Sequence, residues 1–178
     1  MRIPILESAP DMSAAAAEDI AALARQYGSA VFRAAWRVLG ARASAEDVQQ
    51  QVFLRLIESP PRNVESWPAY LTTMGTRLAI DHLRRQRRFR LLAPLWNTDE
   101  PEDSPAEDAE RAEAGRFLRA ALARLNARDA SCFVMRHLHG LTPAAIGAAL
   151  GISENHVSVS VHRARKALEA MQTQEQNR

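Results

Sequence analysis

The 178-residue sequence is poor in the residues that build disulfide-bonded or metal-bound scaffolds, because Cys132 is its only cysteine. One thiol can neither close an internal disulfide nor supply a cysteine-rich zinc site. Cys132 lies in an apolar run, which favours a small buried hydrophobic side chain over a nucleophile. No apolar run approaches the roughly 18 residues of a membrane span, and no export signal opens the sequence. We therefore expect a cytoplasmic protein without stable membrane association.

The signatures of common enzymes are also missing. His137 and His139 are two residues apart and do not share a helix face, and His156 and His162 are six apart with no acidic partner. The sequence contains no glycine-rich phosphate loop and no nucleophile elbow. It therefore predicts neither an enzyme nor a bound metal or cofactor.

Strand signals are scarce, and glycine and proline fall mainly between periodic apolar runs, so we predict an all-α protein. Charge divides the chain into three parts, because residues 1–92 carry a net charge of +4, residues 93–115 carry −7 and residues 116–178 carry +5. This division predicts two small helical domains, over residues 16–92 and 116–172, joined by an acidic linker over residues 93–115. The two basic domains indicate a polyanionic partner.

The first domain contains three helical patterns. Apolar residues recur at helical spacing up to Gly40, which predicts that a first helix ends there. Ser44 is a candidate N-cap for a second helix that ends before Pro60, and Ser66 is a candidate N-cap for a third. The predicted buried positions of these helices are Ile20, Leu23, Tyr27, Val31, Ala34, Val38, Val48, Val52, Leu56, Leu71, Met74 and Leu78.

The third predicted helix ends in five arginines within seven residues, from Arg84 to Arg90, beside Phe89. Trp67 and Tyr70 begin the same helix. Arginines that follow a phosphate backbone, together with aromatic rings that stack on bases, suit single-stranded nucleic acid. A solvated charged face, with the aromatic rings in the core, is the alternative.

The second domain begins with two predicted helices that meet around residues 126–129, followed by a short helix from Thr142 to Gly151. The next segment, ISENHVSVSVHRARKAL, alternates valine and serine at its centre like a half-buried strand. Over its whole length, however, apolar residues recur every three or four positions, and Ser153 is a candidate N-cap. We therefore predict a helix. Its apolar stripe is Val157, Val161, Ala164, Leu168 and Met171.

These two last helices, with small Gly147 at their point of close approach, have helix-turn-helix spacing. In that motif the second helix enters the major groove of DNA. An antiparallel helix pair with a solvated face is the alternative, and the basic charge of the domain favours DNA binding. The residues opposite the apolar stripe are Asn155, His156, Ser158, Val159, His162, Arg163 and Lys166.

The chain resembles the extracytoplasmic-function (ECF) class of sigma-70-type RNA polymerase sigma factors over roughly residues 20–171. The resemblance is carried by AEDVQQQVFLRL and AYLTTMGTRLAIDHLRRQRR in the first domain, and by LRAALARLNARDASCFVMRHLHGLTPAAIGAALGISENHVSVSVHRARKAL in the second. It implies that the first domain, similar to sigma region 2, binds polymerase core (the β and β′ subunits) and melts the minus-ten promoter element. The second, similar to sigma region 4, would read the minus-thirty-five element. An anti-sigma factor is a further partner that the resemblance allows.

By position, the resemblance implies three sets of binding residues. The core-binding set is Glu46, Asp47, Gln50 and Gln51. The minus-ten set is Arg62, Asn63, Ser66, Tyr70, Arg77, Asp81, Arg84, Arg85 and Arg88. The minus-thirty-five set is the face of the last helix opposite its apolar stripe, Asn155, His156, Ser158, Val159, His162, Arg163 and Lys166.

The sequence departs from the family pattern at three places. Gln51 stands where the family usually has Glu, and Arg77 stands where it usually has Asn. Ser158-Val159-Ser160 replaces a usual Lys-Ser-Arg, so two cations are missing from the predicted recognition helix. If both cations met phosphates, the salt dependence of promoter binding should weaken by up to about two units of slope. Val159 is a candidate contact for a thymine methyl group.

Two other kinds of protein compete with the sigma-factor interpretation. An autonomous helix-turn-helix repressor would share the second domain, but it normally carries a dimerisation or effector domain in place of the first. A polymerase-binding adaptor without promoter selectivity is the other alternative, because the recognition helix has fewer cations. The core-binding block of the first domain favours a sigma factor that directs promoter-specific initiation.

Overall fold

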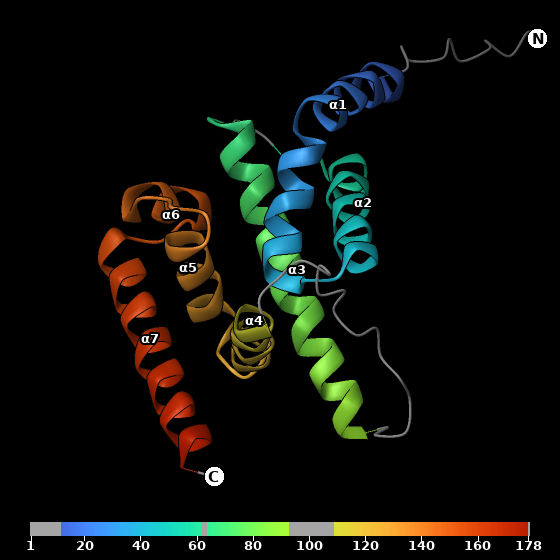
Figure 1. Cartoon of the computed structure of the whole chain (residues 1–178). Coiled ribbons are helices and arrows are strands. Elements are labelled where there is room, and N and C mark those ends of the chain that lie inside the picture. Colours follow the sequence, from blue (N-terminus) through green and yellow to red (C-terminus); the bar gives the residue numbers. More distant parts are fainter. Residues whose placement is uncertain (1–11, 62–63, 93–108, 178) are drawn as a thin grey trace, which may run out of the picture.

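The computed structural model describes residues 12–61, 64–92 and 109–177. Within these ranges the chain forms seven α-helices and no β-strand, which confirms the all-α prediction (Figure 1). The helices are α1 (Met12–Leu39), α2 (Arg42–Glu58), α3 (Trp67–Leu92), α4 (Ala109–Leu122), α5 (Ala127–His137), α6 (Pro143–Leu150) and α7 (Glu154–Gln176). Residues 109–115 of the predicted linker lie in α4, and its residues 93–108 lie outside the described ranges.

Helices α1, α2 and α3 pack on one another in the first domain. The apolar stripes predicted for them point inward, because an amphipathic helix gains stability by removing that face from water. Of the predicted positions, Ile20, Leu23, Tyr27 and Met74 are half-buried, and the buried ones are Val31, Ala34, Val38, Val48, Val52, Leu56, Leu71 and Leu78.

The connection between α1 and α2 is a single tight turn. Gly40 has a φ of +69°, a left-handed conformation that favours glycine, so α1 ends where predicted. The predicted N-cap at Ser44 is wrong, because α2 already begins at Arg42, with Ala41 extended in the cap position and Ser44 buried in the first turn. The glycine turn lets the helix resume at once, and Arg42 pairs with Glu46 across the first turn at 2.9 Å.

Helices α5, α6 and α7 begin at side-chain caps. Asn126 Oδ1 accepts the backbone N–H of Arg128 at 2.9 Å, and Ser153 Oγ accepts that of His156 at 3.3 Å. Thr142 caps α6 in the same way, and Gly151 ends it with a φ of +66°. The valine–serine segment is helical, as predicted, because Val157 and Ser160, three positions apart, both face the interior.

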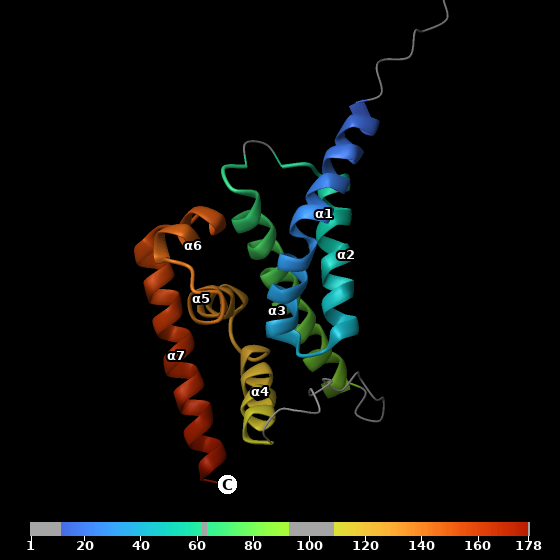
Figure 2. The ribbon, with the colours of Figure 1, turned by 45° about the horizontal axis from the view of Figure 1, so that its top comes forward.

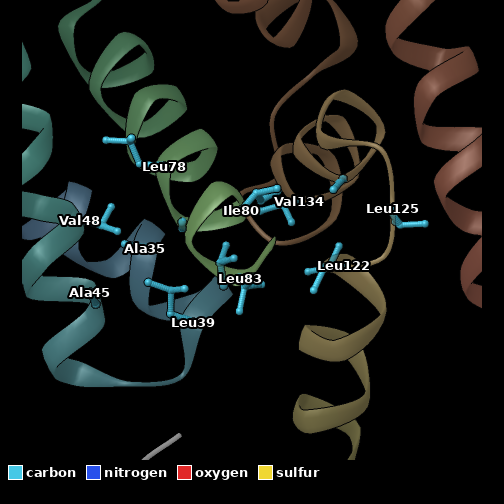
Figure 3. Packing of buried hydrophobic residues seen from close by; sticks show 14 of the residues in the cluster. Ala35, Leu39, Ala45, Val48, Leu78, Ile80, Leu83, Leu122, Leu125 and Val134 are labelled. Carbon is cyan, nitrogen blue, oxygen red and sulfur yellow. The ribbon is translucent and has the colours of Figure 1, made fainter. Parts of the chain in front are cut away.

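The two domains are packed against each other. Helix α5 lies between α3 and α7 in both ribbon views (Figures 1 and 2), and it contacts both helices. Figure 3 shows Ile80 and Leu83 of α3 beside Leu122 at the end of α4 and Val134 of α5, and all four belong to one buried apolar cluster. The second domain therefore covers the part of α3 that carries Ile80 and Leu83.

Candidate functional site

One exposed surface runs along α2 and contains most of the predicted core-binding set. Asp47, Gln50 and Gln51 are exposed, whereas Glu46 is half-buried and paired with Arg42. Leu54 and Ile57 continue the same side of the helix, with exposed fractions of 55% and 56%. We call Asp47, Gln50, Gln51, Leu54 and Ile57 the α2 face. Two large apolar side chains that stay in water at this place indicate a protein-binding surface.

Sequence reasoning missed Leu54 and Ile57. The signal was available, because Val48, Val52 and Leu56 already complete the buried stripe of α2. Apolar residues that fall outside a complete stripe have no place in the core of their own domain. They are therefore candidates for contact with a partner.

The start of α3 holds the first part of the minus-ten set. Arg62 and Asn63 lie outside the described residues. Ser66 is exposed, and its Oγ accepts the backbone N–H of Ala69 at 3.5 Å, as the predicted cap should. Tyr70 is half-buried and packs edge-on against Trp67, with ring centroids 6.1 Å apart. This pair is an aromatic corner at the beginning of the helix, partly open to solvent.

Further along α3, the arginines of the minus-ten set differ in their surroundings. Arg77, Asp81, Arg85 and Arg88 are exposed. Arg84 is half-buried and donates from Nη1 to the backbone oxygen of Leu125, at 2.9 Å, in the second domain. The set is therefore not one continuous free surface in this structure.

The whole minus-thirty-five set lies on the exposed face of α7. Val159 has an exposed fraction of 37%, although an apolar side chain in a helix usually packs inward. The Ser158 hydroxyl donates to the backbone oxygen of Glu154 at 3.0 Å, so toward a ligand it is left as an acceptor. Ser160 is buried at 4% exposure, so of the two positions where the family pattern has a cation only position 158 faces outward.

The helix-turn-helix geometry depends on Gly147. A Cβ atom at this position would lie 2.6 Å from the backbone oxygen of Ile152, which is closer than real Cβ contacts allow. The Gly147 carbonyl also accepts the N–H of Ile152 at 3.0 Å. The missing side chain therefore brings α6 and the start of α7 together and sets the orientation of the exposed face of α7.

Two titratable side chains are shifted by burial. Burial raises the pKa of the Cys132 thiol, which is fully buried against Ser160, so it is a poor nucleophile. Burial, and then the nearby Arg37 guanidinium, lower the pKa of His139 to about 4. His139 therefore stays neutral near pH 7, and its Nε2 lies 2.9 Å from Thr76 Oγ1 of the first domain.

Two of the larger cavities lie where elements of the first domain meet elements of the second. One, of about 600 Å³, is lined by Arg77 and Asp81 of α3 and by residues of α5 and α7. The other, of about 710 Å³, lies between the turn after α1, the end of α3 and α4. Its lining includes five arginines, Arg87, Arg90, Arg116, Arg119 and Arg124. Both cavities extend the basic surface of α3 toward the second domain.

Residues 23–89 match the family model for Sigma-70 region 2, and residues 118–168 match the model for Sigma-70, region 4. The ECF RNA polymerase sigma factor SigL of Mycobacterium tuberculosis is 32% identical over 169 residues, which cover 88% of this chain and 92% of SigL. This chain belongs to the ECF sigma factors. The matched regions contain the α2 face and the exposed face of α7, so both candidate surfaces lie on sigma-factor domains.

Other relatives of this sigma factor are longer. SigE of Mycolicibacterium smegmatis is 32% identical over 153 residues, covering 82% of this chain and 58% of SigE. BldN of Streptomyces coelicolor is 28% identical over 149 residues, covering 80% of this chain and 56% of BldN. The chain therefore spans little more than half the length of these two relatives.

Solved structures share the fold of this sigma factor. CnrH, in complex with the cytosolic domain of CnrY, has a TM-score of 0.55 at 21% identity, covering 90% of this chain and 94% of CnrH. RpoE from Bartonella quintana, in complex with the anti-sigma factor NepR, has a TM-score of 0.54 at 17% identity, covering 88% and 98%. No helix in the described part of the chain is long and apolar enough to cross a membrane.

Proposed function

We propose that this ECF sigma factor binds RNA polymerase core and directs it to promoters with particular minus-ten and minus-thirty-five elements. The observation that carries the proposal is the pair of exposed surfaces, the α2 face on region 2 and the polar face of α7 on region 4, within one chain. A helix-turn-helix repressor has no need of the first surface, and an adaptor has no need of the second. Both together suit an initiation factor.

Contact with polymerase core is assigned to the α2 face. A partner that covers the half-exposed side chains of Leu54 and Ile57 removes apolar surface from water, which stabilises the complex. Asp47 adds a carboxylate that pairs with a basic partner and favours orientation and association rate more than affinity. Because Gln51 carries no charge, the apolar pair supplies a larger share of the binding energy here than the family pattern implies.

Reading and melting of the minus-ten element are assigned to α3. The exposed guanidinium groups of Arg85 and Arg88 suit phosphate oxygens, and the half-open Trp67–Tyr70 corner offers ring surface to an unstacked base. A DNA duplex exposes the faces of its bases only after it melts, so these contacts favour the melted strand over the duplex.

Reading of the minus-thirty-five element is assigned to α7. Asn155 and Ser158 lie near the N-terminal end of the helix, where base edges are reached in the major groove. The Ser158 oxygen is an acceptor, which suits an exocyclic amino group of adenine or cytosine, and Val159 suits a thymine methyl group. Arg163 and Lys166 follow toward the C-terminal half and suit phosphates.

An anti-sigma factor is the regulatory partner that we infer. CnrH was solved with the cytosolic domain of CnrY, and RpoE with the anti-sigma factor NepR. Those identities are low, so the relatives support the kind of partner and not its identity or its binding surface.

Run-off transcription with purified polymerase core and a promoter library tests the proposal. Start sites that depend on this chain and share a pair of upstream elements are the expected result. Core binding without dependent starts would favour the adaptor. Specific duplex binding without core binding would favour the autonomous regulator.

The α2 face gives a sharper test within the same assay. The double variant Leu54→Ser with Ile57→Ser should weaken core binding at least about tenfold, which corresponds to about 1.4 kcal/mol, because it removes the exposed apolar pair. Leu92→Ser is the matched control, since Leu92 is an 84% exposed leucine at the end of α3. Equal losses in the two proteins, measured by titration of labelled chain with core, would contradict the assignment.

A further inference from the structure

The cavity of about 710 Å³ between the turn after α1, the end of α3 and α4 combines apolar and cationic walls. Its buried apolar lining includes Leu39 at the end of α1, Leu83 of α3 and Ala123 after α4 (Figure 3). Four of its five arginines are exposed, namely Arg87, Arg90, Arg116 and Arg124. No aspartate or glutamate is among the described residues that line it. We call this space the arginine cavity.

The fifth arginine, Arg119, is half-buried and lies against two glycines. A Cβ atom at Gly40 would lie 2.5 Å from Arg119 Nη1, and a Cβ atom at Gly115 would lie 3.2 Å from the same atom. The guanidinium group therefore occupies space that side chains at these two positions would fill. A cation placed by packing in this way loses little conformational freedom when it binds an anion.

The lining indicates the chemistry of a ligand. A guanidinium group is planar and always charged, and it binds two oxygens of one phosphate at once. Several such groups around one space favour an anion that carries several charges close together. The cavity volume lies within the range of about 300–1,000 Å³ that is usual for small-molecule sites.

The rest of the lining suits an organic ring rather than a further charge. Leu39 and Leu83 offer apolar surface to its face. Gln86 and Ser44 also line the cavity, and each of their side chains both donates and accepts hydrogen bonds. An aromatic base with polar edges matches this combination.

We propose that the arginine cavity binds a nucleoside polyphosphate, with its phosphates on the arginines of α3 and α4 and its base against the apolar wall. None of the five arginines belongs to the core-binding, minus-ten or minus-thirty-five sets, so the proposal does not depend on promoter reading. The ligand needs no separation of the two domains, because four of the arginines are already exposed.

A polyphosphate is favoured over a monophosphate by the charge of the chain itself. Residues 93–108, which connect α3 to α4 in the sequence, hold six Asp or Glu and no Lys or Arg. Because they are covalently attached, these carboxylates compete for cations at a high effective concentration. One phosphate gains little over them, whereas adjacent phosphates that contact several arginines at once gain more.

Isothermal titration calorimetry on the full-length chain tests the site. ATP and GTP should each bind saturably, at least about tenfold more tightly than AMP and GMP, because the added phosphates contact further guanidinium groups. Inorganic triphosphate, which lacks the base, should bind more weakly than ATP and GTP. The melting temperature of the chain should rise with ATP or GTP, since a ligand that binds only the folded state stabilises it.

The double variant Arg87→Gln with Arg124→Gln removes one exposed guanidinium from each side of the arginine cavity. It should weaken binding of ATP and GTP at least about tenfold. Arg25→Gln with Arg111→Gln is the matched control, because it makes the same change in charge at two exposed positions that do not line the cavity. The control should bind like the unmodified chain.

A second variant tests the shape of the site without changing its charge. Ala120 is an exposed residue of α4 that lines the arginine cavity, so Ala120→Phe fills part of the space. It should weaken binding at least about tenfold, with the circular dichroism spectrum unchanged. Ala114→Phe is the matched control, since Ala114 is exposed on the same helix and does not line the cavity.

Three results would overturn the proposal. Equal affinities for GTP and inorganic triphosphate would leave no role for a base. Equal losses in the two arginine double variants would show a general attraction of the basic chain for polyanions. Binding that appears only after the Asp and Glu residues of 93–108 are replaced by Asn and Gln would show that the chain's own carboxylates hold the cavity. Failure of the proposed function is a separate result, because run-off transcription would then show no dependent start while these affinities stay unchanged.

Discussion

The two domains determine the ends of their helices in different ways. In the second domain Asn126, Thr142 and Ser153 each cap the helix that follows them. In the first domain α2 begins at Arg42, and its N-cap residue Ala41 provides no side-chain cap, because the turn at Gly40 and the packing of Ser44 and Ala45 determine its start. Local chemistry therefore defines the starts of α5, α6 and α7, and tertiary packing defines the start of α2, the helix that carries the proposed core-binding face.

The largest expected effect is at the apolar joint between the two domains. Ile80→Ala should destabilise the chain by about 2–5 kcal/mol, because it removes a fully buried side chain between the two domains. The locally capped second domain should then unfold separately from the first. Urea denaturation followed by near-ultraviolet circular dichroism and by Trp fluorescence should show one transition in the parent and two in the variant. A single unshifted transition in Ile80→Ala would contradict the shared core.

The close approach at Gly147 sharpens the comparison within the second domain. Gly147→Ala should cost about 1–3 kcal/mol, because its Cβ meets the Ile152 backbone oxygen, which cannot move aside like a side chain. Gly140→Ala is the control, since Gly140 has a φ of +69° and open space around its Cβ position. It should cost only the left-handed strain of about 1–2 kcal/mol. Thermal unfolding of both variants measures the difference, and equal losses would argue against the steric role.

The arrangement in which the two domains pack together, here called the closed chain, should respond to acid through His139, whose Nε2 lies 2.9 Å from Thr76 Oγ1 of the first domain. Its pKa in the closed chain is about 4, below the ordinary value of 6.5, so the open chain binds the proton more readily. The closed state is therefore fully favoured above about pH 6.5 and loses up to about tenfold per pH unit between 6.5 and 4. Arg33 and Arg37 of α1 line the same side of the joint as His139.

Distances between spin labels at Ser29→Cys on α1 and Gln172→Cys on α7, in a Cys132→Ser background, measured from pH 7.5 to pH 5, check this behaviour. The unmodified chain should open as the pH falls, because protonation of His139 places a second cation beside Arg37. His139→Gln should give label distances that do not change with pH in this range. The same pH dependence in that variant would assign the opening to another group.

The smallest expected effect is the difference in stability between loss of the Ser153 cap and loss of the Ser66 cap. Ser153→Ala should destabilise the second domain by about 1 kcal/mol, because α7 loses its cap at 3.3 Å. Ser66→Ala should cost less, because the corresponding contact at the start of α3 is 3.5 Å long. Chemical denaturation of the two variants gives the comparison. A larger loss at Ser66 would show that the first domain depends on local capping as much as the second.

Sequence reasoning reached most of the fold for physical reasons that these residues illustrate. The 3.6-residue period outweighed the valine–serine alternation of α7, because Val157, Ala164 and Leu168 are all buried. The start of α2 was misplaced because Ser44 has the chemistry of a cap and the packing of a core residue. Leu54 and Ile57 were missed because an exposed apolar residue is recognised only when the buried stripe is known to be complete.

The domain joint could not be predicted from periodicity at all. Ile80 follows Leu78 by two positions, so it lies off the stripe that faces α1 and α2. Which surface covers it depends on the second domain, which lies far along the chain. Arg84 is a similar case, since an arginine in a basic run is expected in solvent and here meets the Leu125 oxygen.

The buried thiol of Cys132 is a built-in probe for opening of the second domain. It lies with Met135, Ile146 and Val157 in a separate small apolar cluster that joins α5, α6 and α7. A thiol reagent reaches the sulfur only when these three helices separate, so the rate of modification reports how often the helix-turn-helix unit opens. Because the chain has no other cysteine, the modification rate reports on the second domain without a contribution from the first.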